Sequence, residues 1–186
     1  MRPVCYSVAQ SLDGYIAGPN GEADWIVMDP EIDFKQLFAR FDTVLLGRKS
    51  YEAARRQGGG GGMPGMKSHV FSTTLGPADC PGATLSNDPG GTVRDLKQQP
   101  GKAIWLFGGG SLFRSLLELG LVDQVQVGIV PVLLGDGLPL VGHPAKLAKL
   151  KLIQHRVYQK TGTVLLDYEV ANTPARATNA RAKGRR

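Results

Sequence analysis

The stretch Ile104-Trp-Leu-Phe-Gly-Gly-Gly-Ser-Leu-Phe113 decides the fold, because an apolar run breaks into three glycines and then begins an amphipathic helix. Glycines lack Cβ atoms and let backbone N–H groups approach a phosphate closely, and a helix N-terminus adds further donors and the positive end of its dipole. A plain tight turn between a strand and a helix has the same pattern. Alone, the stretch predicts a strand–turn–helix unit and leaves its ligand open.

Short strand-like runs alternate with helical segments along the rest of the chain. The runs are rich in Val, Ile, Leu or aromatic residues and cover 3–10, 43–46, 68–72, 103–107, 124–132, 151–158 and 163–170. The last two are typical of a hairpin around Lys160-Thr-Gly162. This order predicts an α/β protein with a mostly parallel central sheet and an antiparallel C-terminal hairpin.

Three segments have helical patterns. Asp29-Pro30 is typical of an N-cap followed by a first-turn proline, and an apolar stripe at helical spacing comes after it. The stripe consists of Phe34, Leu37, Phe38 and Phe41. A second helix is expected over 111–119, where Gly120 ends it, and a third over 88–99.

Length and composition indicate one well-buried domain. The chain has 186 residues, of which 42% are hydrophobic, and no apolar run reaches the roughly 18 residues that cross a bilayer. The N-terminus lacks a charged-then-apolar signal pattern. Two cysteines and three scattered histidines lack metal-ligand spacing. We therefore expect a cytoplasmic protein with no membrane segment and no metal.

The net charge of +6 is unevenly distributed. Residues 171–186 hold five basic side chains and no acid, whereas the remaining residues hold 17 basic and 16 acidic ones. This pattern predicts a folded domain over 1–170 and a disordered basic tail over 171–186. Unpatterned charges of this kind bind nucleic acid or anionic lipid only at low salt, so nucleic acid is not expected as a specific partner.

Two further strand ends carry chemistry suited to an anion. Gly47-Arg48-Lys49-Ser50 places two cations and a hydroxyl after an apolar run, which suits a full phosphate charge such as the 2′-phosphate of NADP. Ser72-Thr73-Thr74 places hydroxyls after the next run. Ligands of open α/β sheets collect at the carboxyl ends of strands, so three such ends favour a phosphate ligand more than one does.

Two common nucleotide motifs are absent. Phe113 stands where the third glycine of a Gly-x-Gly-x-x-Gly fingerprint belongs, and the stretch follows the fourth strand-like run rather than the first. In 58–68 the lysine comes one residue too late for a P-loop. The five consecutive glycines of that segment are instead expected to form a mobile surface loop.

Four stretches, in the right order, resemble a known family. They are Ala9-Gln-Ser-Leu-Asp-Gly-Tyr-Ile-Ala17, Leu46-Gly-Arg-Lys-Ser-Tyr-Glu52, Pro64-Gly-Met-Lys-Ser-His-Val-Phe-Ser72 and Phe107-Gly-Gly-Gly110. Together they resemble the dihydrofolate reductase-like fold, and more closely its branch related to the reductase domain of the bacterial bifunctional deaminase-reductase of riboflavin biosynthesis. The resemblance covers about residues 1–170 and implies a three-layer α/β/α sandwich with NADPH-dependent reductase activity.

The resemblance also implies a cofactor site and a homodimer. For NADPH it implies Ala9, Ile16, Gly47, Arg48, Lys49, Ser50, Ser72, Thr73, Gly108, Gly109, Gly110, Ser111 and Leu112. The first two would line the nicotinamide, the group at 47–50 the pyrophosphate and 2′-phosphate, the pair at 72–73 the adenosine, and the last five the pyrophosphate. The family's cis peptide would fall between Gly108 and Gly109. The long apolar run 125–134 fits either a dimer surface or a central strand.

The substrate side departs from folate enzymes. Met66 stands where those enzymes carry the arginine that binds the folate carboxylate, so folate would lose its anchor. The family's supporting hydroxyl falls at Val127-Gly128, and neither residue supplies one. Asp29 and Asp33 are both candidates for the substrate-side carboxylate, and we favour Asp33 as the catalytic proton donor, directly or through a water.

The remaining substrate contacts are expected from Asp29 and from two aromatic walls, Trp25 and Phe107. Hydride transfer to a ribose-like aldehyde and to a pterin-like imine both remain open. Two other functions also remain open: a dinucleotide-binding protein without catalysis, and a nucleic-acid-associated protein that acts through its basic tail.

Overall fold

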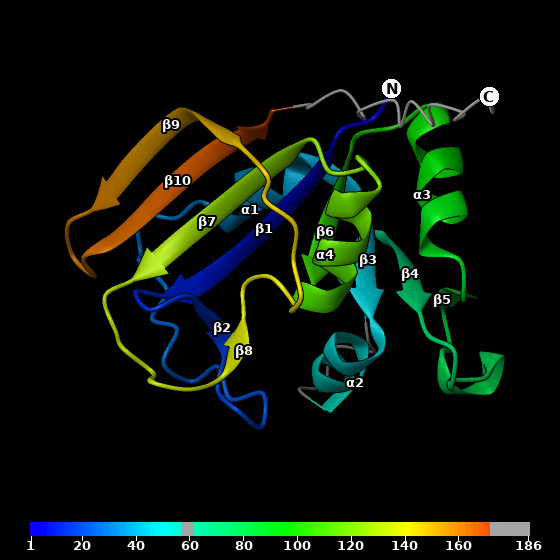
Figure 1. The fold of residues 1–186 in the computed structure, drawn as a ribbon, viewed down its shortest axis with the longest axis horizontal. Coiled ribbons are helices and arrows are strands. Elements are labelled where there is room, and N and C mark those ends of the chain that lie inside the picture. Colours follow the sequence, from blue (N-terminus) through cyan, green and yellow to red (C-terminus); the bar gives the residue numbers. More distant parts are fainter. Residues whose placement is uncertain (57–61, 172–186) are drawn as a thin grey trace, which may run out of the picture.

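An eight-stranded sheet forms the middle of the protein, whose structure is a computed structural model that describes residues 1–56 and 62–171 (Figure 1). The strand order is β5-β4-β3-β6-β1-β7-β10-β9. Every neighbouring pair from β5 to β7 is parallel, whereas β10 is antiparallel to both β7 and β9. The predicted α/β sheet with an antiparallel C-terminal hairpin is therefore confirmed.

The strands of the large sheet are β1 (Val4–Ser11), β3 (Phe41–Gly47), β4 (Lys67–Phe71), β5 (Ala83–Ser86), β6 (Ala103–Gly108), β7 (Gln124–Val130), β9 (Leu150–Tyr158) and β10 (Thr163–Val170). A separate pair consists of β2 (Tyr15–Ala17) and β8 (Leu138–Pro139). The helices are α1 (Phe34–Ala39), α2 (Arg48–Arg56), α3 (Pro89–Gln98) and α4 (Gly110–Glu118), with a 3-10 turn at Pro77–Asp79.

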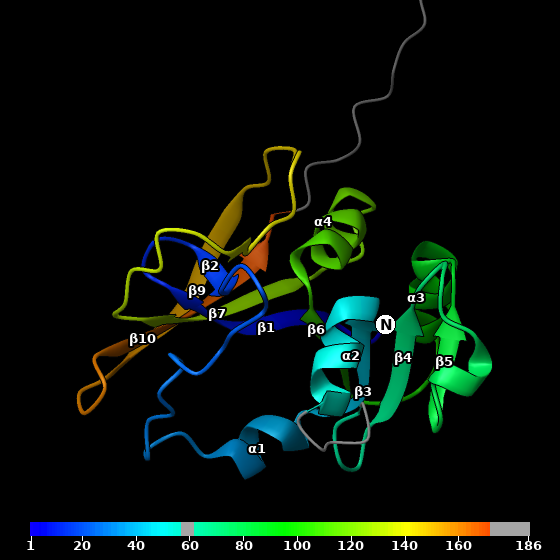
Figure 2. The same ribbon diagram turned by 90° about the horizontal axis from the view of Figure 1, so that it is seen from below.

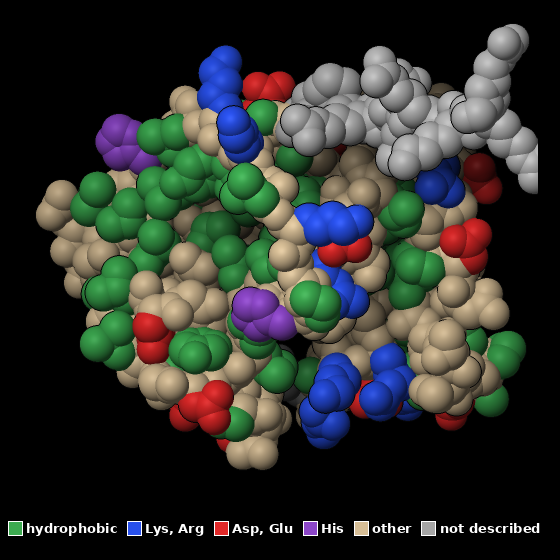
Figure 3. All heavy atoms as spheres, in the orientation of Figure 1, with side chains coloured by type: hydrophobic (Ala, Val, Ile, Leu, Met, Phe, Trp, Pro, Cys, Tyr) green, Lys and Arg blue, Asp and Glu red, His purple; other side chains and the backbone are tan. Residues whose placement is uncertain are grey.

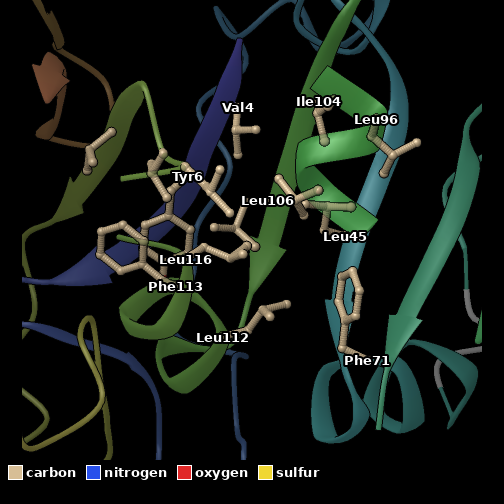
Figure 4. Packing of buried hydrophobic residues seen from close by; sticks show 14 of the residues in the cluster. Val4, Tyr6, Leu45, Phe71, Leu96, Ile104, Leu106, Leu112, Phe113 and Leu116 are labelled. Carbon is tan, nitrogen blue, oxygen red and sulfur yellow. The ribbon is translucent and has the colours of Figure 1, made fainter. Parts of the chain in front are cut away.

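Helices cover both faces of the sheet and make three layers, with α3 and α4 on one side and α1 on the other (Figure 2). Alternation along each strand divides the side chains between two cores. On one face, Tyr6 and Leu106 pack with Leu116 of α4 (Figure 4). On the other, Trp105 packs with Tyr51 of α2 and with Phe38 of α1.

Seven predicted strands and two predicted helices are present within a few residues of their expected bounds. Helix α3 begins after Asp88, whose side chain accepts a hydrogen bond from the Gly91 N–H, and α4 ends next to Gly120, which has φ of +67°. Three strands were not predicted, β2, β5 and β8, because segments of two to four residues carry almost no periodicity. The apolar run 125–134 lies mainly on β7, an interior strand, which accounts for its hydrophobicity.

The predicted start of the first helix is wrong. Asp33, not Asp29, is the N-cap, because the Asp33 side chain accepts a hydrogen bond from the Gln36 N–H at 2.9 Å. Phe41 is not on the helix but begins β3, where it pairs with Ala103. Helix α1 is therefore a six-residue helix rather than a long amphipathic one.

The described residues contain no helix long and apolar enough to cross a membrane. The glycines expected to form a mobile loop fall mostly within 57–61, and the expected basic tail within 172–186, so both lie outside the described residues. The division into a domain over 1–170 and a tail stays a prediction.

Replacing Leu106 with alanine tests the central core. Leu106 is fully buried on the middle strand β6, so Leu106→Ala is expected to lower the free energy of unfolding by about 2–5 kcal/mol. Leu133→Ala is the matched control, because that side chain is 73% exposed, and it is expected to change stability by less than about 0.5 kcal/mol. Urea unfolding followed by circular dichroism measures both; equal losses would contradict the assignment of the core.

Candidate active site

The ends of β3 and β6 meet at their glycines. A Cβ atom placed on Gly47 would lie 3.5 Å from the Gly108 carbonyl oxygen and 3.6 Å from the Gly109 nitrogen. A Cβ on Gly109 would lie 3.6 Å from the Ser50 hydroxyl oxygen at the start of α2. The third predicted strand end lies on the other side of β3, because Gly47 pairs with Phe71, the residue before Ser72, so all three strand ends are side by side.

The glycine turn is closed on its other side by the segment after β8. The Gly142 N–H donates a hydrogen bond to the Gly110 carbonyl at 3.1 Å, and a Cβ on Gly110 would lie 2.6 Å from the Pro139 carbonyl oxygen. The expected cis peptide is present between Gly108 and Gly109. Helix α4 begins directly after this turn, so its first N–H groups lie beside the closely packed backbone.

A cavity of about 2070 Å³ begins at these strand ends. The predicted site residues that line it are Ala9, Ile16, Asp33, Gly47, Arg48, Lys49, Ser50, Phe107, Gly109, Ser111 and Leu112. Those that do not line it are Trp25, Asp29, Ser72, Thr73, Gly108 and Gly110. Most of the expected cofactor residues thus share one cavity with the expected proton donor.

The residues outside the cavity are held by local contacts. The Ser72 hydroxyl oxygen accepts hydrogen bonds from the N–H groups of Thr74 and Leu75 and so caps its own turn. The Trp25 indole N–H donates to the Glu22 carbonyl at 3.2 Å. Gly108 and Gly110 flank Gly109 and shape the turn from behind the cavity wall.

The two cations of α2 lie at the same end of the cavity. Arg48 is paired with Glu52 one turn along the helix, at 3.0 Å between Nη1 and Oε1, and both side chains are partly exposed. Lys49 is exposed and lines the cavity. With the N–H groups at the start of α4, these side chains make this end suitable for a phosphate.

The two candidate carboxylates have different surroundings. Asp29 is 1% exposed, and its Oδ2 accepts hydrogen bonds from the hydroxyl and the N–H of Thr161, at 2.9 and 3.2 Å. Burial raises the pKa of Asp29, but hydrogen bonds from the Glu31 N–H and from Thr161 lower it, and the net pKa lies below the ordinary value. Asp33 is exposed, caps α1 and lines the cavity. Asp29 thus ties the segment before α1 to the β9–β10 turn.

Aromatic side chains form one wall. Trp105 stacks on Phe38 with ring centroids 5.4 Å apart, and Phe107 meets the Trp105 ring edge-on at the same distance. The Trp105 indole N–H donates to the Ser7 carbonyl at 2.9 Å, which fixes the ring against β1. The wall suits a flat, partly apolar ring.

A third carboxylate, Asp13, joins two segments next to the β2–β8 pair. Asp13 accepts a hydrogen bond from the Ser11 hydroxyl at 2.6 Å and others from the N–H groups of Leu134 and Gly135. These bonds, led by the one from Ser11, hold the pKa of Asp13 below its usual value. They join the β1–β2 turn to the segment that leads into β8. Asp13 had no predicted role, because Leu134 and Gly135 lie more than 120 residues further along the chain and only Ser11 is a local partner.

A polar row crosses the far end of the cavity and was also missed. It consists of Ser7, Gln126, Asp167 and Gln154, one each from β1, β7, β10 and β9. Each of these residues occupies an ordinary alternating position in its strand. Only the register brings the four side chains into line.

Cys5 takes no part in the chemistry of this cavity. Burial raises the pKa of its thiol to about 12, so the nucleophilic thiolate is absent near neutral pH. No group of three or more potential metal ligands occurs among residues 1–56 and 62–171.

A parallel sheet with an antiparallel C-terminal hairpin, and a glycine turn opening onto a cavity at its strand ends, is the dihydrofolate reductase-like architecture. The dihydrofolate reductase of Enterococcus faecalis, complexed with NADP(H), superposes with a TM-score of 0.69 over 91% of this chain and 97% of that one, at 14% identity. Residues 2–165 match the family described as the RibD C-terminal domain, and the chain belongs to this reductase-like family.

Individual relatives agree with this membership. The uncharacterized protein YyaP of Bacillus subtilis is 35% identical over 178 residues, which cover 90% of this chain and 94% of YyaP. A structure from Shewanella sp. PV-4, assigned to riboflavin biosynthesis, has a TM-score of 0.78 at 24% identity and covers 92% of this chain and 100% of that one. The Thermotoga maritima diaminohydroxyphosphoribosylaminopyrimidine deaminase/5-amino-6-(5-phosphoribosylamino)uracil reductase has a TM-score of 0.64 at 20% identity, over 91% of this chain and 57% of that one.

Replacing Asp29 with asparagine tests the tie to Thr161. Because the folded-state pKa of Asp29 is lowered, its ionised form stabilises the fold above the unfolded-state pKa of about 3.9, and this stabilisation is lost as pH falls through the lower folded-state pKa. The wild type is therefore expected to be more stable than Asp29→Asn near pH 6, and the difference to vanish toward pH 2. Urea unfolding over this pH range measures it.

Asp24→Asn is the matched control, because it removes the same charge from a nearby segment where no described residue donates a hydrogen bond to the carboxylate. It is expected to leave the pH dependence of unfolding unchanged. A pH-independent difference between the wild type and Asp29→Asn would contradict a stabilising ionised Asp29.

Proposed function

We propose that this protein is an NADPH-dependent oxidoreductase that transfers hydride to a pyrimidine-ribosyl or pterin-like substrate. The observation that carries the proposal is the contact between Gly47 and the Gly108–Gly109 peptide at the mouth of a cavity lined by Arg48 and Lys49. Membership in a reductase-like family supports the oxidoreductase class, and structural neighbours that are reductases support the cofactor.

The glycine turn fits a pyrophosphate. Gly110 is covered by the Pro139 carbonyl, whereas Gly109 and Ser111 on either side of it line the cavity at the N-terminus of α4, where a helix favours an anion. Arg48, Lys49 and Ser50 would hold the pyrophosphate and the 2′-phosphate from α2. Ser72 and Thr73, which lie outside the cavity wall, would contact the adenosine only at its edge.

The nicotinamide would lie against Ala9 and Ile16, which line the cavity between the glycine turn and its far end. When bound, NADPH supplies the hydride. The protein supplies orientation, exclusion of water and a proton. Asp33 lines the cavity and would deliver that proton itself or through a water, whereas Asp29 is occupied by Thr161.

Folate is a poor candidate substrate. Met66 packs against the core that contains Trp105 and Tyr51, so the position where folate enzymes carry an arginine is apolar here. Phe107 lines the cavity and would form one wall for a smaller ring, whereas Trp25, the other expected wall, lies outside the lining next to Asp24 and Ile26, which are part of it. An amino-substituted pyrimidine ring, alone or fused as in a pterin, fits this description.

The test measures binding first and turnover second. NADPH and NADH are titrated by fluorescence, and NADPH oxidation is then followed with dihydrofolate and with a ribitylamino-pyrimidine precursor. Tight NADPH binding and oxidation with the pyrimidine are expected. Failure to bind either nucleotide contradicts the proposal, and binding without turnover of any carbonyl or imine leaves a dinucleotide-binding protein without catalysis. RNA binding that depends on residues 172–186 would instead support a nucleic-acid function of the tail.

Replacing Lys49 with alanine tests the phosphate end. Loss of one charge that contacts the 2′-phosphate is expected to weaken NADPH binding about tenfold and leave NADH binding unchanged. Lys35→Ala is the matched control, because Lys35 is an exposed lysine in the first turn of α1 and does not line the cavity. Equal effects on the two nucleotides would show that Lys49 does not contact the 2′-phosphate.

We also propose a homodimer formed through edge strand β9. Four of its apolar side chains, Leu150, Leu152, Ile153 and Val157, are between 43% and 55% exposed; we call them the β9 patch. Three of them pair with Val170, Tyr168 and Val164 of β10, and the first two of these partners pack on the α4 side of the sheet. The hydrophobic surface over β9 and β10 is visible in Figure 3. A long exposed apolar edge strand needs a cover, and a second copy supplies an identical one.

Placing a charge in the β9 patch tests the dimer. The wild type is expected to sediment as a dimer of the 19.9 kDa chain, and Leu152→Lys as a monomer, because the lysine would be desolvated at the interface. Leu147→Lys is the control, since Leu147 is 91% exposed and lies before β9. A monomeric wild type at micromolar concentration would contradict the proposal.

A further inference from the structure

The polar row at the far end of the cavity is aligned by strand pairing. Ser7 pairs with Gln126, Gln126 with Asp167, and Asp167 with Gln154, so the four side chains emerge on one face of four neighbouring strands. All four line the cavity. A single straight row thus runs from the parallel half of the sheet into the antiparallel hairpin.

Hydrogen bonds fix the middle of the row. The Gln126 amide nitrogen donates to Asp167 Oδ1 at 2.6 Å, and the Ser7 hydroxyl donates to the Gln126 amide oxygen at 2.8 Å. An ionised carboxylate only accepts hydrogen bonds, so Gln126 has to turn its NH₂ group toward Asp167 and its oxygen toward Ser7. The Gln126 side chain is 4% exposed and is held in this one orientation.

This orientation decides what the row offers to a ligand. The Ser7 hydrogen is already used by Gln126, so the Ser7 oxygen is left to accept. Asp167 Oδ2 accepts no hydrogen bond from the described residues, since the bond from Gln126 goes to Oδ1. Ser7 on β1 and Asp167 on β10, with β7 between them, therefore offer acceptors to the cavity, and their complement is a ligand that carries N–H or NH₂ donors.

The row is placed where a substrate ring has to lie. Ser7 precedes Ala9 by two residues on the same face of β1, a rise of about 7 Å along the strand. Ala9 is the expected nicotinamide contact. The aromatic wall begins directly beside the row, because the Trp105 indole N–H binds the Ser7 carbonyl. A ring against this wall would have one edge toward Ala9 and another toward Asp167.

A polar, solvated sheet face is the ordinary alternative. It does not account for Gln126, because a solvated glutamine remains exposed and samples several rotamers. It also does not account for the sharing of one cavity between the row and the aromatic wall. A solvated face and a binding row make different predictions for ligand discrimination.

We propose that Asp167, aligned by Gln126 and assisted by Ser7, is the specificity residue that binds the amino-bearing edge of a pyrimidine ring. The inference rests on the proposed reductase function. It assigns recognition of the ring to the C-terminal hairpin rather than to Asp29 and Asp33. Asp29 and Asp33 then have separate roles: Asp29 holds the segment before α1 in place, and Asp33 delivers the proton. The substrate class is an amino-substituted pyrimidine or pteridine, whose amino donors complement the Asp167 carboxylate.

The test uses the full chain saturated with NADP⁺ and two ring probes. 2,4-Diaminopyrimidine presents amino donors, and 2,4-dimethoxypyrimidine keeps the ring without them. The wild type is expected to bind the diamino probe at least about tenfold more tightly than the dimethoxy probe in calorimetry, and Asp167→Asn to lose this preference. Ser7→Ala is expected to reduce the preference by a smaller factor.

Glu169→Gln is the matched control, because it removes a carboxylate two residues further along the same face of β10, outside the cavity. It is expected to keep the wild-type preference. NADPH affinity, measured on every variant, reports whether the fold and the cofactor site are intact.

The outcomes separate the two proposals. If the wild type does not bind NADPH, the proposed reductase function itself is contradicted. Intact NADPH binding with equal affinity of the wild type for both probes overturns the role of the row. An unchanged preference in Asp167→Asn overturns the role of Asp167, and if that variant does not fold, an unchanged preference in Ser7→Ala overturns the two-acceptor row.

Discussion

The approach of β3 to β6 at their glycines is the constraint on which the glycine-turn end of the cavity depends. Gly47 lies directly against the Gly108–Gly109 peptide, since a Cβ atom on Gly47 would be in van der Waals contact with it at 3.5–3.6 Å. Gly110 has a different neighbour, because the segment after β8 packs its backbone against it. The start of α4 thus lies between the glycine turn and this segment, and Gly109, Ser111 and Leu112 line the cavity there.

The sheet face opposite α4 is apolar on one side of β1 and polar on the other. On the side of β6 and β3 it is apolar, with Trp105 and Val44 in the second core. On the side of β7, β10 and β9 it carries the polar row. Helix α1 is too short to cover both, and Phe38 reaches only the Trp105 side. One continuous surface therefore provides a packing site for helices and, beyond β1, a cavity floor.

Seven strands and the combination of a parallel sheet with an antiparallel hairpin could be predicted from the sequence, because each of these strands has five or more residues. The order of the strands in the sheet could not. Residues of the candidate site could be predicted only where they are consecutive in the sequence, as in 47–50 and 108–112. Asp29 and Asp33 illustrate the limit: both fit an N-cap locally, and only the distant contact with Thr161 distinguishes them. The polar row could not be predicted for the same reason. A shift of one residue in the register of any of its four strands would turn that strand's polar side chain to the opposite face.

The residues that line the cavity are synthesised in two groups, because they belong to elements far apart in the sequence. Every residue of the glycine turn, α2 and the first turn of α4 has been synthesised by residue 118. The floor of the far end waits for β9 and β10, the last described strands, and the buried Asp29 acquires its partner only when Thr161 arrives. The glycine-turn end of the cavity is thus synthesised early, except for the segment 139–142 that packs on Gly110, and the far end is completed by almost the last residues of the fold.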